Sequence, residues 1–175
     1  ISISHTTRKA RPNEVDGKDY YFVDDNEFNT LIRNNSFFEH AKIFNHHYGT
    51  LKEPVLNFLK KGNDVLFDID WQGTQQLKKE KNISLVTIFI LPPNIRALKD
   101  RLLNRHEGQE EIIIKRMNKF GEEISHWNEY NYVVINDDLD LCYNKILEII
   151  VSEKDGKGKK QNFTEVEKKV KELIK

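Results

Sequence analysis

The stretch "VLFDIDWQGTQQLKKEKNISLVTIFIL" (65–91) decides the fold, because it holds two apolar, β-branched runs separated by a charged segment. We expect strands over 65–70 and 85–91, since continuous apolar runs are typical of strands that are covered on both faces. The segment 71–81 between them has the composition of a short helical crossover. A strand, a helix and a strand in this order predict an α/β fold with a parallel sheet.

Helix and strand alternate up to residue 150. Apolar spacing predicts three further helices, over 94–105, 109–127 and 138–150. It also predicts one further strand, over 132–136. Residues 1–50 differ, because the predicted strands 19–23 and 37–44 flank a helix over 26–35. We expect them to form a small mixed sheet apart from the parallel one. A charged, glycine-containing linker then leads to a C-terminal amphipathic helix over 164–175.

The composition limits the classes of function. Lys+Arg and Asp+Glu both number 28, so the net charge is zero and a nucleic-acid binder with a basic surface is not expected. No apolar run is long enough to cross a bilayer. The single cysteine, Cys142, cannot form an internal disulfide, which is typical of a cytoplasmic protein.

The N-terminal segment offers groups that suit a phosphate. Arg8 and Arg11 are three residues apart, and guanidinium forks present paired donors that keep their charge. Tyr20 and Tyr48 can each donate one more hydrogen bond to a phosphate oxygen. The alternative for two such arginines is a solvated surface loop.

Two acids occur where a carboxylate is costly. Glu39 interrupts the apolar strand 37–44, and Asp68 lies near the end of the most apolar run. A structural ion pair would satisfy each acid, and so would a ligand edge rich in donors. Guanine presents such an edge through N1–H and its 2-amino group, whereas adenine presents an acceptor at N1. With Ser4 and Thr50 as hydroxyl partners of guanine O6, these residues predict a guanine nucleotide site.

Further residues suit a second set of phosphates. Asp70 follows Asp68 by two and, at the carboxyl end of a strand, can hold Mg²⁺ directly or through water. Arg105 and Arg116 bracket a segment that contains Gly108, and they can close over transferring phosphates. An exposed helix with Glu–Arg pairs fits the same spacing.

Several stretches, taken in order, resemble guanylate kinases. They are "SISHTTRKARPNEVDGKDYYFV" (2–23), "FFEHAKIFNHHYGT" (37–50), "VLFDIDWQG" (65–73), "RLLNR" (101–105), "EEIIIKRM" (110–117) and "EEISHWNEYNYVVINDDLD" (122–140). The resemblance implies a P-loop NTPase-like parallel sheet with flanking helices, a small mixed α/β lobe that binds GMP, and a helical lid. The implied domain spans 1–150, with the GMP lobe at about 4–60 and the lid at about 104–120. The linker and C-terminal helix of 151–175 follow it.

The resemblance also implies site residues and an activity. The residues implied for GMP are Ser4, Arg8, Arg11, Glu14, Tyr20, Glu39, Tyr48, Thr50 and Asp68. Those implied for catalysis and for ATP are Arg8, Arg105, Arg116, Asp70 and Asn136, with Asp70 near Mg²⁺ and Asn136 near adenine. The implied reaction transfers the terminal phosphoryl group of ATP to GMP, giving ADP and GDP. The implied protein is a cytoplasmic monomer or homodimer that binds neither nucleic acid nor membrane.

Two features depart from the family's pattern. The family's lid has glycine directly after its first arginine, whereas His-Glu-Gly-Gln occupies 106–109 here, so the resemblance does not fix the shape of the lid loop, although both arginines are present. No glycine-rich phosphate loop ending in Lys-Ser or Lys-Thr occurs in the 175 residues. With Ile1 as the first residue, this predicts that roughly thirty residues of an N-terminal strand, loop and helix are missing. The alternatives are an inactive guanylate-kinase-like module that binds phosphopeptides, and a kinase for another nucleoside monophosphate.

Overall fold

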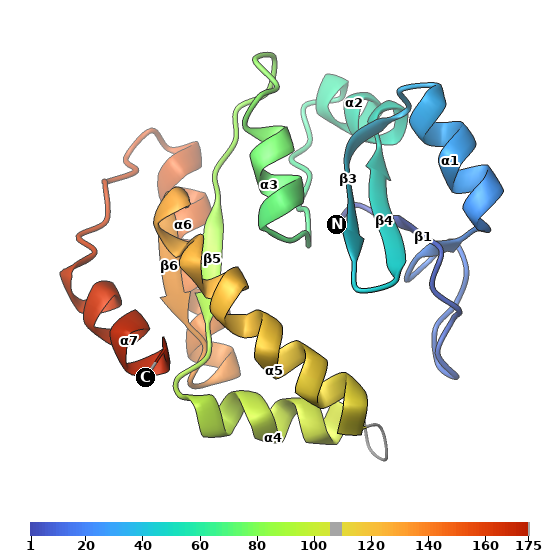
Figure 1. Cartoon of the computed structure of the whole chain (residues 1–175). Helices are drawn as coiled ribbons and strands as arrows, with labels where there is room; N and C mark the ends of the chain where they lie inside the picture. The colour runs from blue at the N-terminus through green and yellow to red at the C-terminus, as the bar shows by residue number, and fades with distance from the viewer. Residues whose placement is uncertain (106–109, 175) are drawn as a thin grey trace. The chain divides into compact units, whose positions relative to one another are not determined.

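The chain forms two compact units, Ile1–Leu85 and Val86–Lys175, each with its own sheet (Figure 1). The computed structural model describes residues 1–105 and 110–174, and for Arg105 the backbone alone. The α/β class and the presence of both a mixed and a parallel sheet confirm the fold expected from the sequence. None of the described helices combines the length and the apolar character that a membrane crossing requires.

The first unit is built on a four-stranded mixed sheet of order β2-β1-β4-β3. Its strands are β1 (His5–Thr6), β2 (Tyr21–Phe22), β3 (Phe37–Ile43) and β4 (His46–Leu51). β1 runs parallel to β2 and antiparallel to β4, and β4 runs antiparallel to β3. The helices are α1 (Asp25–Arg33), α2 (Lys52–Lys60) and α3 (Trp71–Leu77). The mixed lobe is therefore confirmed, and β4 and α2 add to it.

The strand predicted over 65–70 is wrong, because this segment has no regular secondary structure. A strand requires a neighbour along its length, whereas this segment accepts a backbone hydrogen bond from Ser2 N–H at Leu66 O, at 2.8 Å. The side chains nevertheless alternate: Val65, Phe67 and Ile69 pack against the buried Phe38, Val55 and Leu77, while Leu66 is 57% exposed. The apolar run therefore contributes to the core of the first unit without joining a sheet.

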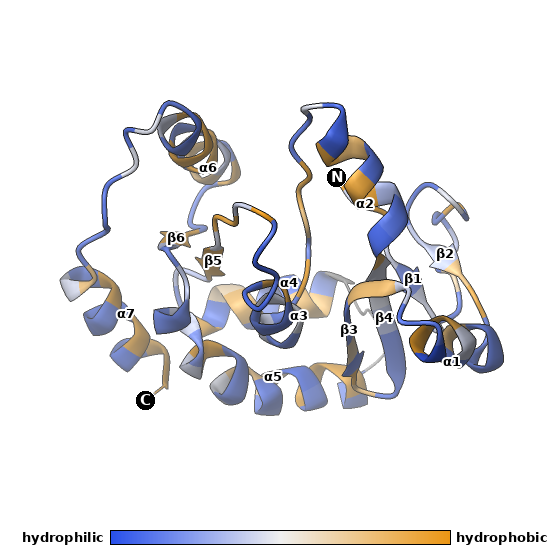
Figure 2. Cartoon of the chain, turned by 90° about the horizontal axis from the view of Figure 1, so that it is seen from above, coloured by the Kyte–Doolittle hydropathy of each residue, from blue (hydrophilic) through white to orange (hydrophobic). Residues whose placement is uncertain are grey.

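The second unit contains a parallel pair of strands, β5 (Ile88–Leu91) and β6 (Tyr132–Ile135), in register from Ile88 opposite Tyr132. Its helices are α4 (Ile95–Arg105), α5 (Glu110–Ser125), α6 (Leu139–Lys154) and α7 (Thr164–Ile174), with a 3₁₀ turn, η1, at Trp127–Glu129. Figure 2 shows α6 on one face of this sheet and α5 and α7 on the other. Both faces are thus covered, as the apolar runs predict.

The C-terminal helix α7 is part of the core of the second unit. Its Val166, Val170 and Leu173 are buried in one cluster with Leu91 and Val133 of the sheet. The opposite face of the sheet packs against α6 in a separate cluster. We infer that α7, together with α5, stabilises the β5–β6 sheet, because both helices bury apolar side chains in this cluster.

Candidate nucleotide-binding site

The cationic end of the candidate site is organised by Glu14. Arg8 donates through Nη1 and Nη2 to the two oxygens of Glu14, at 2.8 and 2.9 Å. Arg11 donates its backbone N–H and its Nη1 to the same carboxylate, at 2.8 and 3.1 Å. The two arginines that the sequence assigns to phosphate therefore lie side by side, held by an acid from the same loop.

Electrostatics reflect this arrangement. The hydrogen bond from Arg8, first among several favourable contacts, lowers the pKa of Glu14 to about 2. The pKa of Arg8 is raised, chiefly by Glu14 and to a smaller extent by Tyr48. Glu14 stays ionised at neutral pH, so the loop presents two guanidinium groups and one carboxylate and remains net cationic.

Tyr20 and Tyr48 also gather around Arg8. The guanidinium carbon of Arg8 lies 5.3 Å from the centre of the Tyr20 ring, and the rings of Tyr20 and Tyr48 meet edge to face at 6.1 Å. The pKa of Tyr20 is raised, first by burial and then by the negative charge of Asp68. The exposed Asp68 is therefore close enough to act on Tyr20. Four residues predicted to contact the nucleotide are thus brought together.

Glu39 forms the other end of the candidate site. Its side chain is 3% exposed, and it is paired across the sheet with Thr50, which is 2% exposed. Burial raises the pKa of Glu39 to about 7, while hydrogen bonds from Thr50 oppose the shift and the charge of Asp70 adds to it. Ser4 Oγ lies 3.1 Å from Thr50 Oγ1. Either hydroxyl can donate in this bond, so Ser4 and Thr50 form one hydrogen-bonded pair next to Glu39.

Gly73 and Gln76, which the sequence reasoning did not single out, hold Glu39 in its place. A Cβ atom built on Gly73 of α3 would lie 2.7 Å from Oε2 of Glu39, so only glycine lets α3 approach. One turn further, the side-chain amide of Gln76 accepts from His40 N–H at 3.1 Å and donates to His40 O at 2.8 Å. A glycine inside a helical pattern is the signal that marks such a close approach.

Asp70 has a structural role in addition to the role predicted for it. Its Oδ1 caps α3 by accepting the Gly73 N–H at 3.0 Å, and its Oδ2 accepts from Gln72 Nε2 at 2.8 Å. Each oxygen keeps a lone pair, which suits contact with the hydration shell of a cation. Among residues 1–105 and 110–174, no three His, Cys, Asp or Glu side chains form a metal-binding group.

The three remaining predicted residues belong to the second unit. Arg116 lies on α5, and Arg105 is the last residue of α4, with a side chain outside the described part. The predicted lid loop 106–109 is also outside the described residues. Asn136 follows β6, where its N–H donates to Leu91 O at 2.8 Å and its carbonyl accepts from Arg101 at 2.9 Å. These bonds leave its side chain available at the carboxyl end of the sheet.

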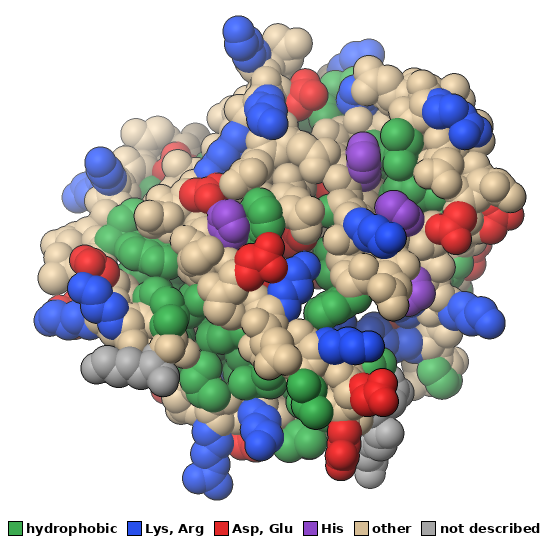
Figure 3. Space-filling model, in the orientation of Figure 1, with side chains coloured by type: hydrophobic (Ala, Val, Ile, Leu, Met, Phe, Trp, Pro, Cys, Tyr) green, Lys and Arg blue, Asp and Glu red, His purple; other side chains and the backbone are tan. Residues whose placement is uncertain are grey.

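Charged side chains of both signs are interspersed on the face seen in Figure 3, in keeping with the zero net charge. The cationic character of the first unit's site is therefore local, arising from Arg8 and Arg11. A local cluster suits a small anion better than a polyanion, which requires an extended basic surface.

Comparison with known proteins identifies the family. The family model described as "Guanylate kinase" matches residues 1–153. The chain is 57% identical to the guanylate kinase of Rickettsia prowazekii (strain Madrid E) over 88% of this chain and 78% of the relative. It is 49% identical to that of Novosphingobium aromaticivorans, over 88% and 70%.

A solved structure agrees with this result. The crystal structure of guanylate kinase from Anaplasma phagocytophilum superposes with a TM-score of 0.76 at 36% sequence identity, covering 87% of this chain and 74% of that one. The resemblance expected from the ordered motifs is confirmed at the level of both sequence and fold. The chain belongs to the guanylate kinase family.

Proposed function

We propose that this protein transfers the terminal phosphoryl group of ATP to GMP, giving ADP and GDP. The observation that carries the proposal is that one unit contains both a buried carboxylate, Glu39, and a guanidinium cluster formed by Arg8 and Arg11. Such a pair suits a ligand that has hydrogen-bond donors at one end and a phosphate at the other. Family membership supports the same reaction.

The acceptor nucleotide is held at its two ends. Ionised Glu39 accepts from guanine N1–H and the 2-amino group, with Asp68, Ser4 and Thr50 completing the base site. Arg8 and Arg11 bind the GMP phosphate, aided by Tyr20 and Tyr48. Glu14 holds both guanidinium groups in place, so that little ordering remains when the phosphate binds.

The donor side of the reaction requires positive charge on the transferring group. Arg105 and Arg116 supply it, since guanidinium groups stabilise the charge that spreads over the equatorial oxygens. Mg²⁺ bound with ATP supplies further neutralisation of the phosphate oxygens. One carboxylate with spare lone pairs, Asp70, fits a magnesium ion that keeps most of its water. Asn136 contacts the adenine.

Residues of about 4–60 form the GMP lobe, about 104–120 the lid, the rest of 1–150 the core, and 151–175 an appended segment. The protein works in the cytoplasm as a monomer or homodimer, without nucleic acid or membrane. The relatives give no support to the alternative of an inactive phosphopeptide-binding module, since they are named guanylate kinases.

The test is an assay of ADP release by the purified protein, with GMP, AMP and UMP as acceptors. We expect GMP to be preferred by at least 100-fold, since a site built for the donors of guanine leaves buried acceptors unpaired with adenine. Equal rates with the three acceptors would refute the proposal.

A matched pair of variants tests the phosphate end. Arg8→Lys keeps the charge but loses the fork, and should reduce kcat/KM for GMP by roughly tenfold or more. Arg33→Lys makes the same change on α1, at a residue that is not proposed to contact GMP, and should leave kcat/KM unchanged. Tighter binding of a phosphoserine peptide than of GMP would favour the phosphopeptide alternative.

A further inference from the structure

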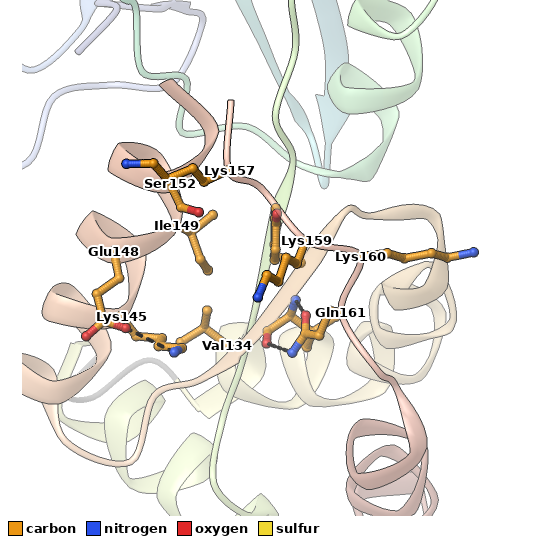
Figure 4. Close-up of a pocket in the computed structure, with 11 residues that line it drawn as sticks. Val134, Lys145, Glu148, Ile149, Ser152, Lys157, Lys159, Lys160 and Gln161 are labelled. Atoms are coloured by element: carbon orange, nitrogen blue, oxygen red, sulfur yellow. Dashed lines mark hydrogen bonds and ion pairs between the residues drawn. The ribbon is translucent and has the colours of Figure 1, made fainter. Parts of the chain in front are cut away.

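The second unit contains a cavity that the proposed reaction does not use. Its volume is about 760 Å³, which is within the range of small-ligand pockets. Three segments line it: the start of β6, one side of α6, and residues 155–161, which we call the strap (Figure 4). The strap passes from the end of α6 to the segment before α7.

The strap has a defined conformation. It leaves α6 through Gly156, whose φ of 67° is readily adopted by glycine. Gly156 N–H donates to Glu153 O at 3.1 Å and Lys157 N–H donates to Ser152 O at 2.8 Å, which together make a Schellman helix end. A Cβ atom on Gly158 would collide with the Glu153 carboxylate, so the strap passes close to that side chain.

Two further contacts hold the strap above the sheet. Tyr132 donates its hydroxyl proton to Glu153 at 2.5 Å and accepts the backbone N–H of Lys159, and the bond to Glu153 is the main cause of the raised pKa of Tyr132. Gln161 accepts from Val133 N–H at 2.7 Å and donates to Val133 O at 3.0 Å. The cavity therefore has a roof fixed at both ends.

The lining combines an apolar floor with a cationic rim. The floor includes the buried Val134 and Ile149, which are 6% and 8% exposed. The charged lining residues are Lys145, Glu148, Lys157, Lys159 and Lys160. Lys145 pairs with Glu148 at 3.0 Å and Lys157 pairs with Asp155 of the strap at 3.1 Å, so the excess positive charge of the rim comes from Lys159 and Lys160. In Figure 4 the ammonium group of Lys159 lies over the cavity, whereas that of Lys160 extends away from it.

We propose that this strap cavity binds a small amphiphilic anion, one phosphate or carboxylate head on an apolar body. The head pairs with Lys159, and the body covers Val134 and Ile149. Burial of the body provides the main driving force, because an exposed ammonium group alone binds an anion weakly. Because the strap crosses the cavity, we take its occupant to be a free molecule rather than a lipid in a bilayer. This site lies outside the residues proposed for GMP and ATP.

The test is a titration of the ¹⁵N-labelled chain with octyl phosphate below its micelle concentration, followed by amide shifts. We expect saturable shifts centred on Val133, Val134 and Ile149, and at least tenfold weaker binding of inorganic phosphate. Shifts centred elsewhere, or equal binding of inorganic phosphate, would overturn the proposal.

Variants separate the head from the body of the ligand. Lys159→Gln should weaken octyl phosphate binding about fivefold, while Lys160→Gln, the same charge change one residue on, should alter it less than twofold. Ser152→Phe fills the cavity from α6 and should abolish binding while thermal unfolding shows an intact fold. Unchanged binding in both Lys159→Gln and Ser152→Phe contradicts the proposal.

Vesicles of phosphatidic acid and phosphatidylcholine should not sediment the chain, and sedimentation that Lys159→Gln abolishes would show a membrane ligand instead.

Discussion

The carboxylate of Glu39 lies against the backbone of Gly73, so closely that a Cβ atom on Gly73 would fall 2.7 Å from Oε2. A separation of this size is below any stable contact between carbon and oxygen. The buried acid that we propose to select guanine therefore depends on the absence of a side chain in the first turn of α3.

Gly73→Ala should displace Glu39 and weaken GMP selection. We expect KM for GMP to rise roughly tenfold or more, since a hydrogen bond to a charged group contributes about 1.5–3 kcal/mol. The rate with AMP should change little, so the ratio of kcat/KM values measures the effect. Gly121→Ala on α5, where a Cβ atom meets nothing within 4 Å, is the matched control and should not alter KM. Equal behaviour of the two variants would argue against the positioning role of Gly73.

GMP binding should depend on the ionisation of Glu39. Burial raises its pKa to about 7, and only the ionised form accepts from both guanine donors. KM for GMP should therefore fall as pH rises from 6 to 8. Glu39→Gln keeps the titration of the GMP phosphate but should lose this extra dependence and discriminate poorly between GMP and AMP. A pH profile shared by both proteins would show that Glu39 does not control binding.

The same residue should make the folded state less stable at high pH. A carboxyl group with a pKa raised from 4.5 to about 7 holds its proton more tightly when folded. Its contribution to stability is therefore fully present below pH 4.5 and is lost as pH rises to about 7. At pH 8, Glu39→Gln should unfold at a higher urea concentration than the wild type, because its free energy of unfolding should be larger by up to about 3 kcal/mol. The difference should vanish near pH 4, and a constant difference across this range would exclude the linkage.

Glu14→Gln should act in the opposite direction. The pKa of Glu14 is lowered to about 2, so its contribution to stability is present above about pH 4.5 and is lost as pH falls toward 2. At pH 7 we expect a loss of about 2–3 kcal/mol and a higher KM for GMP, because Arg8 and Arg11 lose their common acceptor. Glu165→Gln removes an 82% exposed partner of Lys168 and should cost less than about 0.5 kcal/mol.

Val170→Ala should destabilise the second unit by about 2 kcal/mol, because it leaves a cavity between α7 and the sheet. Lys168→Ala changes an exposed residue on the same helix and should stay within about 0.5 kcal/mol. Urea unfolding of both variants measures the difference. Equal stabilities would mean that α7 does not belong to this core.

The sequence predicted well those features that depend on local pattern. The parallel pair β5–β6, the mixed lobe and the grouping of Arg8 with Tyr20 all follow from apolar periodicity and side-chain chemistry. The strand expected over 65–70 failed because an apolar run specifies burial but not a hydrogen-bonding neighbour.

Other features depend on contacts between segments far apart in the chain. Nothing near Glu39 in the sequence indicates that Gly73, thirty-four positions later, makes room for it. The role of α7 was equally hidden, because an amphipathic pattern shows that a helix has an apolar side but not which surface covers it.

Gln76 and Gln161 perform the same task in the two units, each pairing its amide with both backbone groups of one strand residue, His40 in β3 and Val133 in β6. Each imitates a neighbouring strand for the length of a single residue. An outer strand whose backbone groups are already satisfied cannot serve as a template for a second molecule. At His40 and Val133, therefore, the backbone of each strand is closed to pairing with a strand of a second molecule.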